Sequence, residues 1–592
     1  MSGDERYDAV IVGAGVAGAL IAKRLTLAGF RVLVLEAGPA TAASYEGYSN
    51  HLERFYEASG KGPESAWPPA ANAPQPDTAD LRQNNGYFVQ NGPDLYGSSY
   101  TRLQGGSTLH WLGVSLRMLP DDFKLRSRYG VGRDWPLSYD DIEPFYRKAE
   151  EEIGVSADVA DQKYHGLTFA DGYDYPMQRV PLSYSDRKLA AAVDGLQVAL
   201  DEAPVALKVR SYPAARNSTP RGSYRPLGAV DMREDGKAVE RFFGQRCAGN
   251  TSCTPICPIQ AKYNAGKTLA QADRNKLQVF AQAVASKIDI DTVTGEVQSV
   301  TYQRYQGISR SVYRAKARVY VLAAHAVENA KLMLASGLTG PKEMVGKTLM
   351  DHPALYAWGL APETIGAFRG PLSTAGIEEL RAGAFRAKHA AFRFDIGNDG
   401  WRATTGAPDT AVADAVAKNL FGRKLRDQLS STLSRQVRFS LAIEQLPEPG
   451  NCVSIDPRYL DPLGNPRPVI SYKIGEYTLA GMAAATKVYR QIFQRAGIED
   501  FSDKSGSGWF PSVQYGEVTY RYHGMGHFSG THAMGGDSSS SVVDSYQRSW
   551  NHRNLYLAGS GSFPTMGTSN PTLTLSALAI RTAERLISEL TA

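Results

Sequence analysis

Three of the four cysteines lie within eleven residues, as Cys247, Cys253 and Cys257. Their spacing is C-x5-C-x3-C, and Pro258 directly follows the last of them. Thiolates on a loop with a proline after the final ligand are typical of iron–sulfur ligation. Three local ligands without a nearby fourth favour a 3Fe-4S cluster over zinc, which usually takes four ligands and C-x2-C spacing. A disulfide plus one free thiol is the alternative. Cys452 lies in an expected strand and is predicted to be a buried apolar side chain.

A second motif lies near the N-terminus, where Gly13, Gly15 and Gly18 form G-x-G-x-x-G directly after the apolar residues 7–12. Gly13 permits a tight turn, Gly15 lets the backbone approach a pyrophosphate, and Gly18 allows close packing of helix on strand. Glu36 ends the next predicted strand, where it can accept hydrogen bonds from ribose hydroxyls. The motif therefore predicts a βαβ unit that binds a dinucleotide, FAD or NAD, with its phosphates at the helix N-terminus.

The composition narrows the class of protein. The chain has 592 residues, of which 43% are hydrophobic and 21% charged, with a net charge of +5. There is no dense Lys/Arg tract, so the sequence does not favour nucleic-acid binding. No apolar run reaches the length of a transmembrane helix. The first apolar stretch is too short for a signal-peptide core, so we expect no export signal in the chain itself.

The segments between the motifs predict helices and strands and contain no candidate catalytic residues. Residues 40–100 are polar and irregular. Residues 139–153 predict a solvated helix with an acidic first turn, and residues 277–323 are rich in predicted strands. Residues 405–435 have helical periodicity and mixed charge. Residues 573–590 predict an amphipathic helix that packs back on the nucleotide-binding part.

Several separated stretches resemble the glucose–methanol–choline (GMC) oxidoreductase family. They are the N-terminal motif, residues 105–111 (GGSTLHW), residues 345–353 (VGKTLMDHP) and residues 523–592. Residues 134–146 (DWPLSYDDIEPFY) resemble the branch of bacterial sugar, polyol and sugar-acid dehydrogenase large subunits, as does the cysteine loop. The resemblance spans nearly the whole chain and implies that the bound nucleotide is FAD.

The family implies an α/β fold of two domains. A Rossmann-like FAD-binding domain is assembled from discontinuous segments, beside a substrate domain whose antiparallel sheet is covered by helices. We place the FAD-binding domain, including the cysteine loop 245–262, at residues 1–45, 85–120, 240–355 and 520–592. We place the substrate-binding domain at residues 121–239 and 356–519, with the positions that read the substrate within 360–450 and 470–520.

The resemblance also implies a catalytic pair, His527 and Asn570. A hydride leaves a carbinol carbon more easily as the hydroxyl proton departs, so a base must lie within hydrogen-bond reach of that oxygen. A neutral histidine suits this task, and an asparagine can orient the hydroxyl while the flavin takes the hydride. His532 is the rival base. Phe528, where the family often has a small residue, is expected to narrow the pocket.

The glycine-rich segment is expected to bind the cofactor through Gly105, Gly106, Ser107 and His110. In some family members a histidine in this segment bonds covalently to the flavin. His110 is therefore either such an attachment point or a packed histidine beside the isoalloxazine.

A flavin accepts two electrons at once, whereas an iron–sulfur centre passes them singly. The combination favours a dehydrogenase that exports electrons. The alternatives are an FAD oxidase that makes H2O2, a non-catalytic electron-transfer scaffold and an NAD-dependent dehydrogenase. In the resembling complexes a c-type cytochrome subunit is the acceptor, and a small chaperone-like subunit carries the export signal. The resemblance thus implies a periplasmic enzyme, bound to the membrane only through a partner, that oxidises a sugar, polyol or sugar acid. A cytoplasmic enzyme is the alternative.

Overall fold

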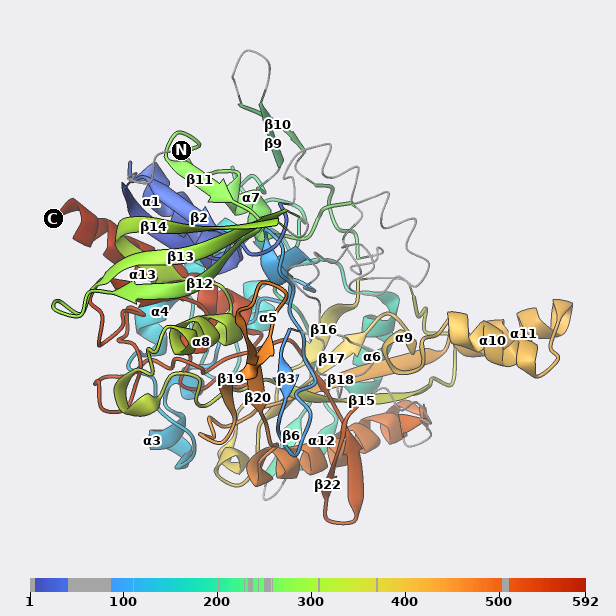
Figure 1. Cartoon of the computed structure of the whole chain (residues 1–592). Coiled ribbons are helices and arrows are strands. Elements are labelled where there is room, and N and C mark those ends of the chain that lie inside the picture. The colour runs from blue at the N-terminus through green and yellow to red at the C-terminus, as the bar shows by residue number, and fades with distance from the viewer. Residues whose placement is uncertain are drawn as a thin grey trace.

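The computed structural model of the chain contains two seven-stranded sheets joined by helices and long connections (Figure 1). The described residues are 6–40, 87–109, 111–200, 203–227, 229–232, 238–242, 244–249, 257, 259–306, 309–368, 371–502 and 510–592.

The first sheet contains the βαβ unit predicted from the glycine motif. Its strands run in the order β11-β2-β1-β14-β13-β12, and β25 pairs with β14. The bounds are β1 Arg6–Val12, β2 Val32–Leu35, β11 Leu277–Phe280, β12 Ala283–Ile290, β13 Val297–Gln306, β14 Ser309–Leu322 and β25 Leu555–Leu557. Parallel pairing joins β11, β2, β1, the second half of β14 and β25. The first half of β14 pairs antiparallel with β13. The predicted Rossmann-like fold built from discontinuous segments is confirmed.

Helices from both ends of the chain cover this sheet. Helix α1 (Val16–Leu27) begins directly after the glycine turn and buries an apolar face that includes Leu20 and Leu25. It packs against α13 (Pro571–Thr591), which in turn packs against α4 (Tyr139–Ile153). The C-terminal helix therefore lies on the nucleotide-binding part, as predicted.

The second sheet is antiparallel throughout, with the order β21-β15-β18-β17-β16-β7 and with β24 beside β15. The bounds are β7 Val209–Ser211, β15 Pro353–Leu360, β16 Ser373–Ile377, β17 Phe392–Gly397, β18 Gln436–Ile443, β21 Glu499–Asp500 and β24 His523–Gly524. Phe439 of β18 contacts Phe493 of the long helix α12 (Glu476–Ala496), with ring centroids 5.6 Å apart. Because side chains alternate along a strand, Arg438 and Ser440 lie on the opposite, polar face.

Two segments cross the predicted domain boundaries. β24 belongs to a segment predicted for the FAD-binding domain, yet it pairs with β15 in the second sheet. α4 belongs to a segment predicted for the substrate domain, yet it packs on α13. The assignment of residues to two domains stays a prediction.

Helices α10 (Asp409–Ala417) and α11 (Gly422–Leu433) extend away from the body of the protein (Figure 1). They account for the helical periodicity of residues 405–435. Within the described part of the chain, no helix combines the length and apolar character needed to cross a membrane.

Candidate active site

A cavity of about 850 Å³ is lined by the glycine motif, by the start of α8 (Ala326–Ala335) and by the polar face of the second sheet. Seven residues predicted for the site line it: Gly13, Gly15, Glu36, Gly106, Ser107, His527 and Asn570. A cavity of this size suits a cofactor together with a small substrate.

The glycines of the motif have different surroundings. A Cβ on Gly18 would lie 2.0 Å from the carbonyl oxygen of Gly13, so only glycine lets α1 approach β1 this closely. A Cβ on Gly15 would meet nothing within 4 Å, because Gly15 faces the cavity. Gly15 is also the N-cap of α1, and no side chain caps that helix end. Its free backbone N–H groups therefore offer donors to an anion in the cavity.

Glu36 and the glycine-rich segment lie beside this helix end. The Glu36 carboxylate accepts hydrogen bonds from the backbone N–H groups of Ala14 (2.9 Å) and Gly38 (2.8 Å), and burial raises its pKa. The Gly105 N–H donates to the carbonyl of Ala14 at 3.1 Å. Gly106 begins the short 3-10 helix Gly106–Leu109. His110 lies outside the described residues, so its role stays a prediction.

The buried Arg102 supplies a second anion-binding group. Its Nη2 donates to Glu328 Oε1 at 2.7 Å. Its Nη1 is buried and has no hydrogen-bond partner among the described residues. A cationic donor left unpaired at a cavity wall beside an uncapped helix N-terminus fits a ligand with phosphate groups. The residues present therefore fit the FAD that the family implies.

His527 and Asn570 lie side by side at the cavity wall. Asn570 Nδ2 lies 3.2 Å from His527 Nε2, and both residues line the cavity. Asn570 is the N-cap of α13, and Pro571 occupies the first helical position, where a proline is favoured. His527 follows β24, so the pair joins the second sheet to the C-terminal helix.

The hydrogen-bond partners of the pair fix the direction of every bond. His352 Nε2 lies 2.8 Å from the carbonyl oxygen of Gly567, which can only accept, so Nε2 carries the proton and Nδ1 does not. His352 Nδ1 lies 2.7 Å from His527 Nδ1, which must then donate. On the other side, Arg393 Nη2 donates to Asn570 Oδ1 at 3.0 Å, and this sets the amide orientation. Neutral His527 consequently carries its lone pair on Nε2, which accepts from Asn570 Nδ2 at the cavity wall.

The surroundings also keep His527 neutral. Its pKa is lowered well below the usual range by burial, and His352 and Arg393 lower it further. The Asp351 carboxylate accepts the backbone N–H groups of His352 (2.7 Å) and His527 (3.0 Å), and burial raises its pKa to about 6. His532, the rival base, is fully buried and does not line the cavity.

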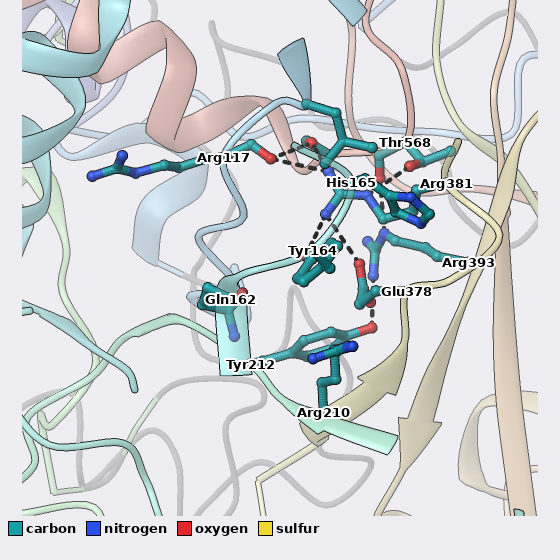
Figure 2. A network of polar contacts seen from close by, with 12 residues as sticks. Arg117, Gln162, Tyr164, His165, Arg210, Tyr212, Glu378, Arg381, Arg393 and Thr568 are labelled. Atoms are coloured by element: carbon teal, nitrogen blue, oxygen red, sulfur yellow. Dashed lines mark hydrogen bonds and ion pairs between the residues drawn. The ribbon is translucent and has the colours of Figure 1, made fainter. Parts of the chain in front are cut away.

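A network of buried arginines supports the loop before Asn570 (Figure 2). Arg393 Nε donates to the carbonyl of Thr568 at 2.8 Å, and Arg381 Nε donates to the Thr568 hydroxyl at 3.1 Å. Arg381 also bonds Ser569 and donates to the carbonyl of Arg117 at 3.0 Å. Both arginines are fully buried, so the position of Asn570 rests on charged groups that have no access to water.

Sequence reasoning gave no role to Asp351, His352, Arg381 or Arg393. Asp351 and His352 belong to the stretch 345–353 that carried the family resemblance. For Arg393 the signal is charge at alternate positions of an apolar strand, in Phe-Arg-Phe-Asp-Ile. Such alternation marks a strand whose polar face lies against a site.

Two of the three clustered cysteines are described. Cys247 and Cys257 lie buried in one apolar cluster with Val180 and Ala261, and no disulfide joins them to each other. Cys253 lies outside the described residues, and among those that are described no group of three His, Cys, Asp or Glu side chains could hold a metal. Cys452 is also free, but it is only partly buried, because it begins the sheet-edge strand β19 (Cys452–Leu460).

Comparison with known proteins decides the family. Residues 207–354 and 447–579 match models described as GMC oxidoreductase, and residues 11–56 match an NAD(P)-binding Rossmann-like domain. The chain is 30% identical to the fructose dehydrogenase large subunit of Gluconobacter japonicus over 98% of both chains. The chain belongs to the GMC oxidoreductase family. It is also 24% identical to the gluconate 2-dehydrogenase flavoprotein of Pantoea cypripedii, over 98% of this chain and 94% of the relative.

A solved structure supports the architecture. Pyridoxine 4-oxidase from Mesorbium loti superposes with a TM-score of 0.59 at 16% identity, covering 98% of this chain and 99% of that one. The family models and the fructose dehydrogenase relative show the class of reaction: this GMC oxidoreductase is an FAD-dependent enzyme that acts on CH–OH groups.

The surroundings of Gly18 and Gly15 predict a loss of stability for one alanine variant and a loss of FAD binding for the other. Gly18→Ala should lower the free energy of unfolding by about 1–3 kcal/mol, because its Cβ overlaps the backbone of Gly13. Gly15→Ala should cost less than about 1 kcal/mol but should lower FAD content, because its methyl group enters the cavity. Thermal unfolding of the apoprotein and flavin-to-protein ratio measure the two effects. Wild-type flavin content in Gly15→Ala would contradict this placement of the dinucleotide.

The two shifted pKa values predict the acid limb of activity. Flavin reduction by substrate should be constant from about pH 8 to 6.5, because His527 is already deprotonated there. The rate should fall as the pH passes about 6, where Asp351 takes up a proton and releases the amides of His352 and His527. Rapid-mixing measurements across this range test the profile, and Asp351→Asn should lack the limb near pH 6. If the wild-type rate instead fell around pH 6.5 or above, the pKa of His527 would not be lowered as the structure indicates.

Proposed function

We propose that the protein is a dehydrogenase that oxidises a hydroxyl of a sugar, polyol or sugar acid, with His527 as base and Asn570 as the orienting group. The observation that carries the proposal is the His527 ring at the cavity wall, with Nδ1 bonded to His352 and Nε2 bonded to the amide of Asn570. No other histidine of the 523–532 region combines a cavity position with this fixed partner among the described residues.

A substrate hydroxyl placed at this pair replaces Asn570 Nδ2 as the donor to His527 Nε2, and its oxygen accepts from the freed Asn570 Nδ2. When bound, FAD supplies the acceptor for the hydride that leaves the carbinol carbon. The hydroxyl proton moves to Nε2 as the C–H bond breaks, so the alcohol loses two electrons and two hydrogens and becomes a carbonyl compound. The proton on Nδ1 stays bonded to His352, and Arg393 holds the amide toward the reacting oxygen.

The relatives support the substrate class. One relative is named for fructose and another for gluconate, and both cover nearly the whole chain. The base and the orienting amide act on the carbinol carbon alone, so the rest of the substrate must be recognised by the second sheet.

We further propose that electrons leave through a 3Fe-4S cluster held by Cys247, Cys253 and Cys257. The indole N–H of Trp111 lies at the cavity wall and donates to the carbonyl of Tyr263 at 2.8 Å. Tyr263 is two residues from Ala261, which packs with both described cysteines. This short route from the cavity to the cysteine loop supports an outward electron path.

The partners and the location belong to the same proposal. One relative is a large subunit, which implies a multi-subunit enzyme for that protein. By the family resemblance, we propose a small subunit that carries the export signal, a c-type cytochrome acceptor and a periplasmic location. Co-expression with candidate small-subunit and c-type cytochrome genes, followed by cell fractionation, tests this. Recovery of active enzyme with the cytoplasm would favour the alternative location.

The catalytic assignment predicts a defect in the chemical step. His527→Ala should slow anaerobic flavin reduction by at least about 100-fold. The substrate used is whichever of D-fructose, D-sorbitol and D-gluconate reduces the wild-type flavin fastest. Asn570→Ala should also slow it, while FAD content stays unchanged in both variants. His552→Ala is the control, because His552 does not line the cavity. Unchanged reduction in His527→Ala would exclude it as the base, and wild-type protein that no polyol reduces would exclude the proposed function.

The cluster assignment predicts iron. Anaerobically purified protein should contain about three irons per flavin, with acid-labile sulfide and an EPR signal in the oxidised state. Cys247→Ser and Cys257→Ser should lose iron and keep flavin, whereas Cys452→Ser should keep both. Turnover should then be faster with an artificial one-electron acceptor than with oxygen. Flavin without iron in such a preparation would favour an oxidase.

A further inference from the structure

The polar face of the second sheet forms the part of the cavity beyond the catalytic pair. In the strand register, Asp395 lies beside Ser440 and Ser440 beside Tyr356, so the three residues form one row across β17, β18 and β15. All three line the cavity, and His523 stacks on Tyr356 with ring centroids 4.1 Å apart. The row presents carboxylate, hydroxyl and aromatic groups, a combination suited to a hydroxylated carbon skeleton.

A single guanidinium ties Asp395 to the catalytic pair. Arg393 Nη1 forms an ion pair with Asp395 Oδ1, while Nη2 of the same side chain donates to Asn570 Oδ1 at 3.0 Å. Because the guanidinium is planar and rigid, the carboxylate and the amide are held on neighbouring sides of it. Asp395 and the amide that orients the reacting hydroxyl are thus bonded to the same guanidinium and line the same cavity.

Asp395 retains one oxygen for a ligand. Its Oδ1 accepts from Arg393 and Tyr212, whereas no described residue donates to Oδ2, and the side chain is 13% exposed at the cavity. Asp399 repeats the pattern further along: Oδ1 accepts from Arg438 Nε at 3.1 Å, and Oδ2 has no donor among the described residues. A free carboxylate oxygen accepts hydrogen bonds from hydroxyl groups strongly.

The charges on this face are balanced. Each of the two carboxylates is matched by its arginine, and Arg402 and Asp409 further out add one charge of each sign. The described residues of this face thus carry no net positive charge to attract an anionic substrate. A substrate carboxylate placed near the free Oδ2 atoms would instead be repelled.

We infer that Asp395 binds the hydroxyl on the carbon next to the one oxidised, so that the enzyme selects vicinal diols of uncharged polyols and sugars. This rests on the proposed function and narrows it to neutral substrates. Asp399, held by Arg438, lies where it can accept a hydroxyl further along the same skeleton. Asp395 acts here in substrate recognition, and Asn570 and His527 keep their roles in the chemical step.

Two isomeric ring diols test the inference. Anaerobic flavin reduction is followed for FAD-loaded wild type, Asp395→Asn and Asp399→Asn with trans-1,2-cyclohexanediol and 1,4-cyclohexanediol, which have equal numbers of hydroxyls. Asparagine keeps an Oδ1 that accepts from Arg393 and Tyr212 and replaces only the free Oδ2. Wild type should prefer the vicinal isomer by about tenfold or more, because a site built to bond a hydroxyl rejects a compound that lacks it. Asp395→Asn should reduce this preference to about twofold, while Asp399→Asn should retain it.

Flavin content and thermal unfolding of the variants establish that they are folded and loaded. D-sorbitol and D-gluconate extend the test to charge, and wild type should favour the neutral polyol. If Asp395→Asn keeps the preference for the vicinal diol, the inference is wrong and the proposed function still holds. The same follows if the wild type reduces its flavin faster with D-gluconate than with D-sorbitol. Wild type that no diol or polyol reduces overturns both.

Discussion

The active site depends on a buried histidine that must stay neutral and must keep its lone pair turned toward the cavity. Burial alone disfavours the imidazolium, but it does not choose between the two ring nitrogens. The choice is made by a chain of directional bonds that begins at a backbone carbonyl, which only accepts, and ends at a guanidinium, which only donates. His527 and Asn570 sit between these fixed ends. Their proton positions follow from partners that cannot change roles.

This constraint explains why residues far apart in sequence meet here. Gly567 precedes the C-terminal helix, His352 precedes β15, and Arg393 lies on β17. The nucleotide-binding sheet contributes the anion-binding end of the cavity, and the antiparallel sheet contributes the arginines. Neither part holds the catalytic pair alone. The C-terminal helix, packed on α1 and starting at Asn570, connects the two ends of the cavity.

The sequence was sufficient for the elements with local signals. The spacing of Gly13, Gly15 and Gly18 after an apolar strand indicates a nucleotide turn, and the helices at 139–153 and 573–590 follow from periodicity. His527 and Asn570 were reached only through the family resemblance, since nothing local separates His527 from His532. Short patterns mark the strand of Arg393 and the stretch of Asp351 and His352, but they do not give the partners of these residues, because those come from strand register and from segments that meet only in the fold. The domain boundaries stay a prediction, and β24 and α4 pack across the predicted ones.

Arg393 touches Asn570 with one nitrogen and Asp395 with the other, so the groups for chemistry and for recognition share one side chain. The two arginine–aspartate pairs on this sheet therefore differ in what a substitution would affect. A change at Arg393 is expected to alter turnover and selectivity together, because this side chain bonds both the orienting amide and the recognition carboxylate. The Arg438–Asp399 pair is a separate unit one row further along, packed over Gly397. Substitutions at that second pair are thus expected to change selectivity with the least effect on the orientation of Asn570, because Asp399 and Arg438 bond each other.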